Sequence, residues 1–193
     1  MARPLEASFL GASEMATDAI VALMAEHRRI EGVLDWLDLL ADRGATRTQL
    51  RDATKFLRGY ADAYHHAKEE DVLFRAMVDE GMSEDEPPIV LMLEQHGEAR
   101  RLVGDLAEIA EAGAGELSED EQRRFARVAG DYVALLRTHI REEDEVVYPI
   151  ARARIRPAAW DEVERECAEI DAERRDEVAA LLGIAERLSG TSR

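Results

Sequence analysis

Apolar residues recur every three to four positions along most of the chain, which is the period of an amphipathic α-helix. This period predicts a first helix over about residues 17–40 and a second from residue 46 or 48 to residue 80, followed by Gly81. A third helix is expected to follow the turn at residues 83–88 and to end near residue 112. A fourth should run from Ser118 to about Tyr148, where Pro149 perturbs or ends it.

Three of the expected helix starts have a Ser or Thr followed three residues later by a Gln or Glu, which is the spacing of a capping box. The pairs are Thr46 with Gln49, Ser83 with Glu86, and Ser118 with Glu121. Short connections join the four helices, so we expect an all-α fold, an antiparallel up-down-up-down four-helix bundle over residues 17–153. An N-terminal segment of residues 1–16 precedes it.

A fifth helix is predicted over residues 157–188, and it has a heptad-like apolar stripe. The stripe consists of Trp160, Val163, Cys167, Ile170, Leu181, Ile184 and Leu188. An amphipathic stripe does not identify its own partner, so two placements stay open. We favour packing against the bundle of the same chain over an interface in a homodimer; the chain would then be a monomer or a homodimer.

The composition narrows the classes of partner. The chain has 193 residues and a formal net charge of −17, which argues against nucleic acid because phosphate binding needs clustered basic charge. No run approaches twenty apolar residues, and residues 1–16 lack the pattern of a secretory signal. The single cysteine, Cys167, excludes an intramolecular disulfide. We therefore expect a cytoplasmic protein that does not bind membranes.

The chain contains an internal repeat. "HHAKEED" at residues 65–71 aligns with "THIREED" at residues 138–144, and "EHRRIEGVLDWL" from Glu26 aligns with "QHGEARRLVGDL" from Gln95. Each half therefore has a histidine followed about forty residues later by His-x-x-x-Glu. The aligned pairs are His27 with His96, His66 with His139, and Glu70 with Glu143.

These six residues are expected to face one another inside the bundle. Residues four apart share a helix face, so His66 and Glu70 should point the same way. Glu70 and His96 each lie roughly 20 Å along their helices from the turn that joins them. Imidazoles and carboxylates are costly to bury unpaired, and a metal centre would pair them. Two iron ions, each with two histidines and sharing both glutamates, would use all six, although imidazoles also suit zinc and copper.

At these residues the chain resembles the hemerythrin family, specifically the hemerythrin-like HHE cation-binding proteins, over about residues 17–150. The motif is His27, His66-x-x-x-Glu70, His96 and His139-x-x-x-Glu143, with "EEDEVVYP" at its end. The resemblance implies a non-haem di-iron site, two iron ions with an oxygen bridge, that meets small oxygen species: dioxygen, peroxide or nitric oxide.

One position departs from the pattern of oxygen-carrying hemerythrins, which have a second histidine one turn after the one that matches His96. Arg100 stands there in this chain. Each iron would then have about five ligands and an open position. This favours peroxide or nitric oxide chemistry, or sensing, over reversible oxygen carriage.

The residues next to the motif are expected to support the site rather than to bind metal. His65 lies about 100° around the helix from His66, so we favour a place at the rim or in a hydrogen bond to a ligand. Ligation by His65 stays open, because only a spare histidine could supply the missing ligand. Glu69 and Glu142 are turned away from the ligand face by the same angle. The tyrosines are expected to pack, although a phenol near an open iron could ligate it or donate a hydrogen bond.

Three functions remain open at this point. The first is a di-iron protein that binds or reduces small oxygen species, with peroxide breakdown as a possible catalase-like activity. The second is a sensor in which the same site reports iron or oxygen without turnover. The third is a purely structural metal such as zinc.

Overall fold

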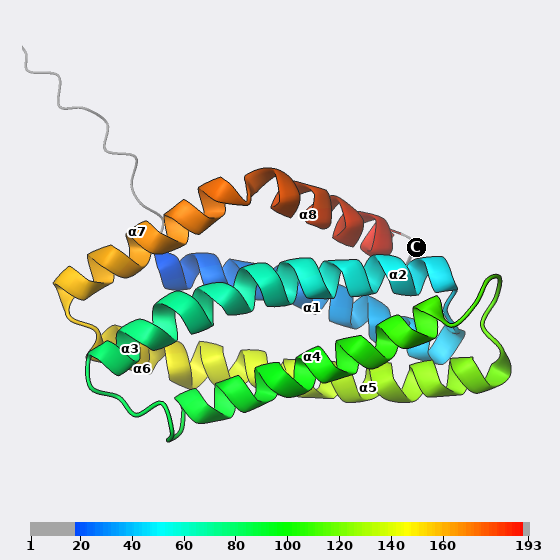
Figure 1. The fold of residues 1–193 in the computed structure, drawn as a ribbon, viewed down its shortest axis with the longest axis horizontal. Helices are drawn as coiled ribbons and strands as arrows, with labels where there is room; N and C mark the ends of the chain where they lie inside the picture. The colour runs from blue at the N-terminus through cyan, green and yellow to red at the C-terminus, as the bar shows by residue number, and fades with distance from the viewer. Residues whose placement is uncertain (1–17, 191–193) are drawn as a thin grey trace, which may run out of the picture.

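The computed structural model describes residues 18–190, and the regular elements in this range are helical (Figure 1). The prediction of an all-α fold is confirmed. The expected N-terminal segment of residues 1–16, and the expected first helical residue at position 17, lie outside the described range. Among the described helices, none combines the length and the apolar character needed to span a membrane.

The first long helix, α1, spans Ala19–Arg43. Asp18 caps its start, because the carboxylate accepts hydrogen bonds from the backbone N–H groups of Ile20 and Val21 at 3.0 and 3.2 Å. The helix ends at Gly44, whose φ of +89° lies in the left-handed region that glycine adopts without strain. A short connection then returns the chain along the bundle.

The second long segment is not a uniform α-helix. It consists of α2 (Arg47–Phe56), the π-helices η1 (Leu57–His66) and η2 (Glu69–Phe74), and α3 (Arg75–Asp79). The capping box at its start, Thr46 with Gln49, is confirmed. A π-helix has i→i+5 hydrogen bonds and therefore turns less per residue than an α-helix, so it changes which side chains share a face. These π-helical turns carry two of the chain's histidines.

The third and fourth segments differ from expectation at one end each. The helix α4 spans Ile89–Glu111, so the predicted capping box at Ser83 is wrong. Prolines 87 and 88 explain this, since proline lacks an N–H and disfavours helical geometry in the residue before it. The capping box at Ser118 is confirmed and starts α5, Glu119–Glu142.

The fourth segment continues past Pro149 through the π-helix η3 (Glu143–Val147) and then α6 (Tyr148–Arg154). Of the two alternatives expected at Pro149, the helix is perturbed there and does not end. The π-helical turn shifts the hydrogen-bond register just before Pro149, so the missing N–H falls in the first turn of α6, where proline is tolerated.

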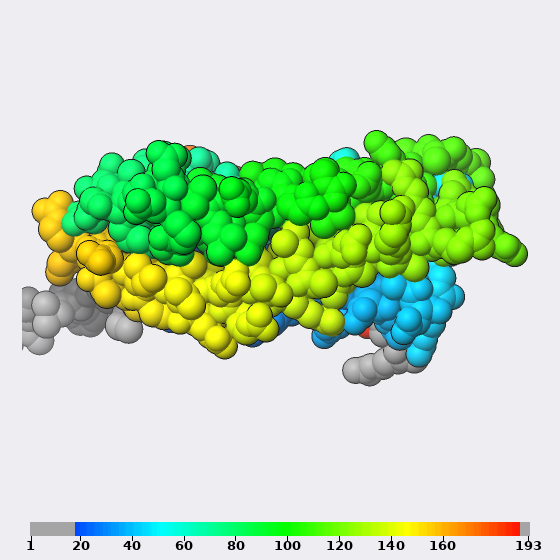
Figure 2. All heavy atoms as spheres, turned by 90° about the horizontal axis from the view of Figure 1, so that it is seen from below, coloured from blue at the N-terminus to red at the C-terminus, as the bar shows by residue number. Residues whose placement is uncertain are grey.

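Consecutive long segments run in opposite directions along the bundle (Figure 1). The helix α5 packs against both α1 and α4, and α2 packs against α4. Figure 2 shows α4 and α5 lying side by side along one face of the molecule. All four segments therefore present one side to a common interior.

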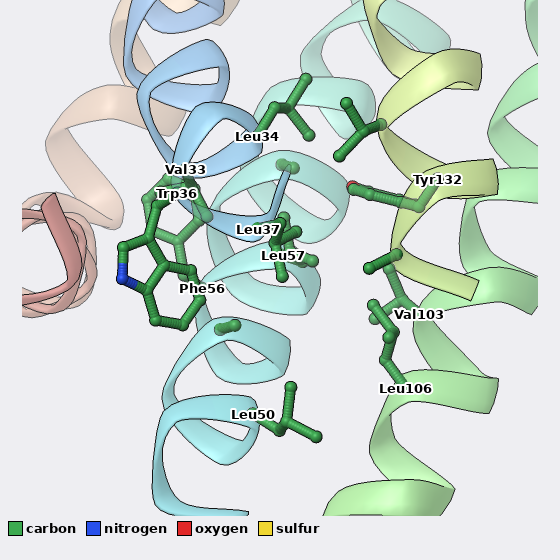
Figure 3. Packing of buried hydrophobic residues seen from close by; sticks show 14 of the residues in the cluster. Val33, Leu34, Trp36, Leu37, Leu50, Phe56, Leu57, Val103, Leu106 and Tyr132 are labelled. Carbon is green, nitrogen blue, oxygen red and sulfur yellow. The ribbon is translucent and has the colours of Figure 1, made fainter. Parts of the chain in front are cut away.

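Buried apolar residues form two clusters, one toward each end of the bundle. The larger cluster packs Leu34 and Leu37 of α1 with Leu57 of η1, Leu106 of α4 and Tyr132 of α5 (Figure 3). The smaller cluster lies at the other end and joins residues of α1, η2, α4, α6 and α7. A buried polar layer separates them, and it contains the residues described in the next subsection.

The predicted fifth helix is two helices, α7 (Pro157–Glu173) and α8 (Arg175–Gly190), separated at Arg174. The helix α8 packs on α1 and α2 and adds Leu181 and Leu188 to the larger apolar cluster. Leu181 approaches the backbone so closely at Gly59 that a Cβ on that glycine would stand 2.8 Å from the leucine Cδ1. In this structure the stripe is covered within the chain.

We expect the substitution Leu181→Ala to lower the free energy of unfolding by about 2–5 kcal/mol, because it leaves a cavity between α8 and the bundle. Leu91→Ala on α4 is the matched control, since Leu91 is 37% exposed; its effect should stay within about 0.5 kcal/mol. Urea denaturation at two protein concentrations measures both. If Leu181→Ala were as mild as the control, α8 would not pack on its own bundle.

Candidate metal centre

Two groups of potential metal ligands meet in the buried layer between the apolar clusters. One group consists of His66, Glu69, His96 and His139, and the other of His27, His65, Glu69 and Glu143. Within each group the ligand atoms lie within 4.8 Å of one another. None of these seven side chains is more than 2% exposed, and together they include all five histidines of the chain.

The imidazole rings share one orientation, because each Nδ1 faces an oxygen atom outside the two groups. The Nδ1 distances are 2.7 Å to Asp144 for His27, 2.9 Å to Glu26 for His65, 2.7 Å to Glu70 for His96, 2.7 Å to Gln95 for His139, and 3.6 Å to Asp62 for His66. The first four are hydrogen bonds, and the last is too long for one. Histidines that bind metal through Nε2 are oriented in this way by a partner on Nδ1.

The inward-facing atoms lack the partners that buried polar atoms normally have. Among the described residues, no hydrogen bond reaches the Nε2 of His65, either ring nitrogen of His66, the Oε2 of Glu69, or either carboxylate oxygen of Glu143. Leaving such atoms unpaired in a buried site is costly, and native proteins rarely do so. Nitrogen and carboxylate oxygen donors are what iron, zinc and manganese bind, so the donor set fits a pair of cations.

The surroundings favour neutral imidazole on some histidines and not on others. Burial lowers the pKa of His66 to about 3, and burial also lowers the pKa of His65. Burial opposes a charge on His27 too, but its contacts with Asp144 and Glu143 raise its pKa to about 9. His27 is therefore protonated at neutral pH when no metal is bound. Metal binding needs the neutral ring, so it should release this proton.

The pKa values of the two central carboxylates are shifted in opposite directions. Burial and the nearby charge of Glu143 raise the pKa of Glu69, whereas the surrounding histidines lower the pKa of Glu143 despite its burial. Tyr148 donates a hydrogen bond of 2.6 Å from its hydroxyl to Glu69 Oε1. Burial and the adjacent Glu69 raise the pKa of Tyr148, so its phenol stays protonated.

Five of the six residues expected at the centre are brought together: His27, His66, His96, His139 and Glu143. Glu70 is not among them. Its carboxylate points outward, 2.7 Å from His96 Nδ1 and 2.7 Å from Arg100 Nη2. Glu69 occupies the central position instead, and His65, expected at the rim, lies in the His27 group.

The spacing of the side chains accounts for this difference. The expectation for Glu70 took only His66 as the reference, whereas Glu69 follows His65 by four residues and His66 by three, so it can share a helix face with both. The sequence does contain a signal for this. The first copy of the repeat contains both "HH" and "EE", so two pairs in it have the His-x-x-x-Glu spacing: His65 with Glu69, and His66 with Glu70. The second copy has "TH" and "EE", and only His139 with Glu143 has that spacing.

The structure also places a fifth histidine, His65, with the four that were expected at the centre. Because His65 joins His27, the histidines divide into a group of three and a group of two. Arg100 does not stand in for a ligand. Its guanidinium pairs with Asp62 and Glu70 on the outer side of the site, each at 2.7 Å.

A cavity of about 380 Å³ lies between η1 and α4 and reaches His66. Its walls are largely apolar, and Tyr132 and Val103, which both appear in Figure 3, contribute to them. Arg58, Asp62 and Arg100 are its charged lining residues. A small molecule can therefore approach one side of the buried layer from the surface.

Comparison with known proteins agrees with this geometry. Residues 18–151 match a family model described as "Hemerythrin HHE cation binding domain". Neither a curated protein nor a solved structure matches the chain. The matched range contains every member of both groups and ends before α7.

The neighbours Glu69 and Glu70 provide a matched pair of substitutions. We expect Glu69→Gln to weaken the binding of two divalent cations together, because this carboxylate belongs to both groups. Glu70→Gln removes the charge that faces His96 Nδ1 and Arg100 and should weaken binding of one cation by about 10–100-fold. Competition titrations with a chromophoric chelator measure both affinities. Stronger damage from Glu70→Gln than from Glu69→Gln would contradict this assignment.

Proposed function

Because the chain belongs to the hemerythrin HHE cation-binding family, we propose that it holds two iron ions and binds or reacts with small oxygen species. The species are dioxygen, peroxide or nitric oxide. The observation that carries the proposal is the buried layer in which imidazole Nε2 atoms and two carboxylates converge while outer oxygens hold the Nδ1 atoms. Bound iron would supply an acceptor for an oxygen-atom ligand and one-electron exchange.

The two iron positions would be unequal. Glu143 Oε2 lies 3.1 Å from His27 Nε2 and 3.2 Å from His139 Nε2, so this carboxylate faces both groups, as Glu69 does. The His66 group then offers five side chains and the His27 group four. An exogenous ligand would find more room on the His27 side.

Tyr148 is the residue of this chain best placed to act on such a ligand. Its hydroxyl lies 3.3 Å from His27 Nε2 and donates to Glu69 Oε1. Its ring stacks on His27 with centroids 5.6 Å apart, which holds the hydroxyl in place. Because a phenol has a single O–H, Tyr148 would donate to an incoming oxygen atom by turning its hydroxyl away from Glu69 Oε1, and the buried surroundings would strengthen that bond.

The rest of the site controls access and water. The two apolar clusters enclose the layer from both ends of the bundle, which keeps bulk water from the buried atoms. The cavity of about 380 Å³ reaches the layer at His66, so a ligand that enters there would have to cross from the His66 group to the His27 side. A buried polar layer with apolar clusters at both ends suits a small uncharged ligand.

The first test of this proposal is the stoichiometry of iron and of a bound ligand. The reduced protein, loaded without oxygen, should contain two irons per chain and bind one nitric oxide per iron pair, since the His27 side offers fewer side chains than the His66 side. Iron analysis combined with titration followed by absorption measures both ratios. A single iron per chain, or equal preference for structural zinc with no reaction toward oxygen species, would contradict it.

The second test concerns Tyr148. The substitution Tyr148→Phe should retain both irons but destabilise the adduct with dioxygen or nitric oxide by about tenfold, the loss expected for one hydrogen bond of about 1.4 kcal/mol. Tyr60→Phe is the control, because Tyr60 is equally buried in η1 and is not part of either group. The lifetime of the adduct after rapid mixing gives the comparison. An unchanged lifetime in Tyr148→Phe would exclude this role.

A further inference from the structure

We propose that α7, which lies outside the region that matches the family, positions His65 at the metal centre through Asp171, Lys68 and Glu26. The inference rests on the metal centre proposed above. The helix α7 would then contribute to the binding of one of the two metal ions, in addition to its packing against the bundle. The residues concerned are positioning residues, and none of them belongs to either ligand group.

The three side chains form a continuous line of contacts that ends at the imidazole. Glu26 Oε2 lies 2.9 Å from His65 Nδ1, and its other oxygen, Oε1, contacts the ammonium group of Lys68. The same ammonium group lies 2.9 Å from Asp171 Oδ1 on α7. Glu26, whose carboxylate orients His65, is thus in contact with the Lys68 ammonium group. Asp171 of α7 contacts the same ammonium group from the other side.

Lys68 is the unusual member of this line, because its side chain is only 1% exposed. A buried ammonium group needs charged or hydrogen-bonding partners. Lys68 has carboxylates on both sides and stands 4.0 Å from the centre of the Tyr64 ring. The Tyr64 hydroxyl donates to Asp171 Oδ1 at 2.6 Å, which fixes the outer end of the line.

The C-terminal helices also hold the backbone segment from which His65 projects. Arg174, at the break between α7 and α8, donates to the carbonyl oxygen of Ala63 in η1. Leu181 of α8 lies against Gly59 in the same π-helix. Both the ring partner of His65 and its backbone therefore depend on contacts from beyond residue 151.

The other histidines are supported from within the bundle. The partners of their Nδ1 atoms are Asp144, Gln95, Glu70 and, at a longer distance, Asp62, all inside residues 18–151. Only for His65 does the described line of contacts continue to α7. If Asp171 lost its charge, Glu26 would be the remaining carboxylate partner of the Lys68 ammonium group. Lys68 would then compete more strongly with His65 for the Glu26 carboxylate. The cation on the His27 side should then bind less tightly, and the other should be unaffected.

The test is an anaerobic titration of the full chain with Fe²⁺ in competition with a chromophoric chelator. Asp171→Asn is the central variant, and because the Asp171 side chain is 42% exposed, this change should leave the fold intact. Glu166→Gln is the matched control, since it removes another ion pair between α7 and the bundle, that with Arg75. Each variant is made in the wild-type and in the His65→Ala chain, and Asp171→Glu tests rescue.

We expect Asp171→Asn to weaken one of the two Fe²⁺ equivalents by about tenfold and to leave the other unchanged. Glu166→Gln should bind both as the wild type does, Asp171→Glu should restore most of the loss, and Asp171→Asn should have no further effect once His65 is alanine. Equal weakening of both equivalents, or the same loss without His65, would overturn the inference. Two tight equivalents in Asp171→Asn would overturn it and leave the proposed function standing, whereas a wild type that binds no Fe²⁺ would overturn both.

Discussion

Five imidazoles and two carboxylates lie buried between two apolar clusters, and the rest of the structure depends on how they are partnered. An unpaired polar group in such surroundings costs roughly 2–7 kcal/mol, so several of them together would be comparable to the whole stability of an ordinary domain. The structure provides hydrogen-bond partners on the outer side of four of the five rings and leaves most inward-facing atoms without one. This division is what a pair of bound cations requires, because the metal replaces the missing partners on the inner side.

One helical segment supplies three of these groups, His65, His66 and Glu69, from its π-helical turns η1 and η2. Glu69 follows His65 by four residues and His66 by three, so the three side chains share one face. The π-helical turn η3 precedes Tyr148 in the fourth segment. Such turns are less stable than regular helix and occur often at functional sites. Here the contacts of α8 at Gly59 and of Arg174 at Ala63 brace η1 from outside.

Much of this could be predicted from the sequence, because it depends on periodicity and on the repeat. The helical fold follows from the 3.6-residue apolar period, and the repeat selected His27, His66, His96, His139 and Glu143. The choice between Glu69 and Glu70 could not be made, since the doubled residues of the first copy admit two registers and only the packed helix selects between them. For the same reason, ligation by His65 stayed an open alternative. The break at Arg174 and the line from Asp171 to His65 join residues about a hundred positions apart, and only tertiary packing shows them.

The account makes one central claim, that the buried layer holds two metal ions with Glu69 between them. Anomalous diffraction at the iron edge from crystals of the iron-loaded protein tests it most directly. We predict two peaks in the layer, one beside His66, His96 and His139 and the other beside His27 and His65, with the Glu69 carboxylate contacting both. A single peak, or a pair in which Glu70 takes the place of Glu69, would contradict the account.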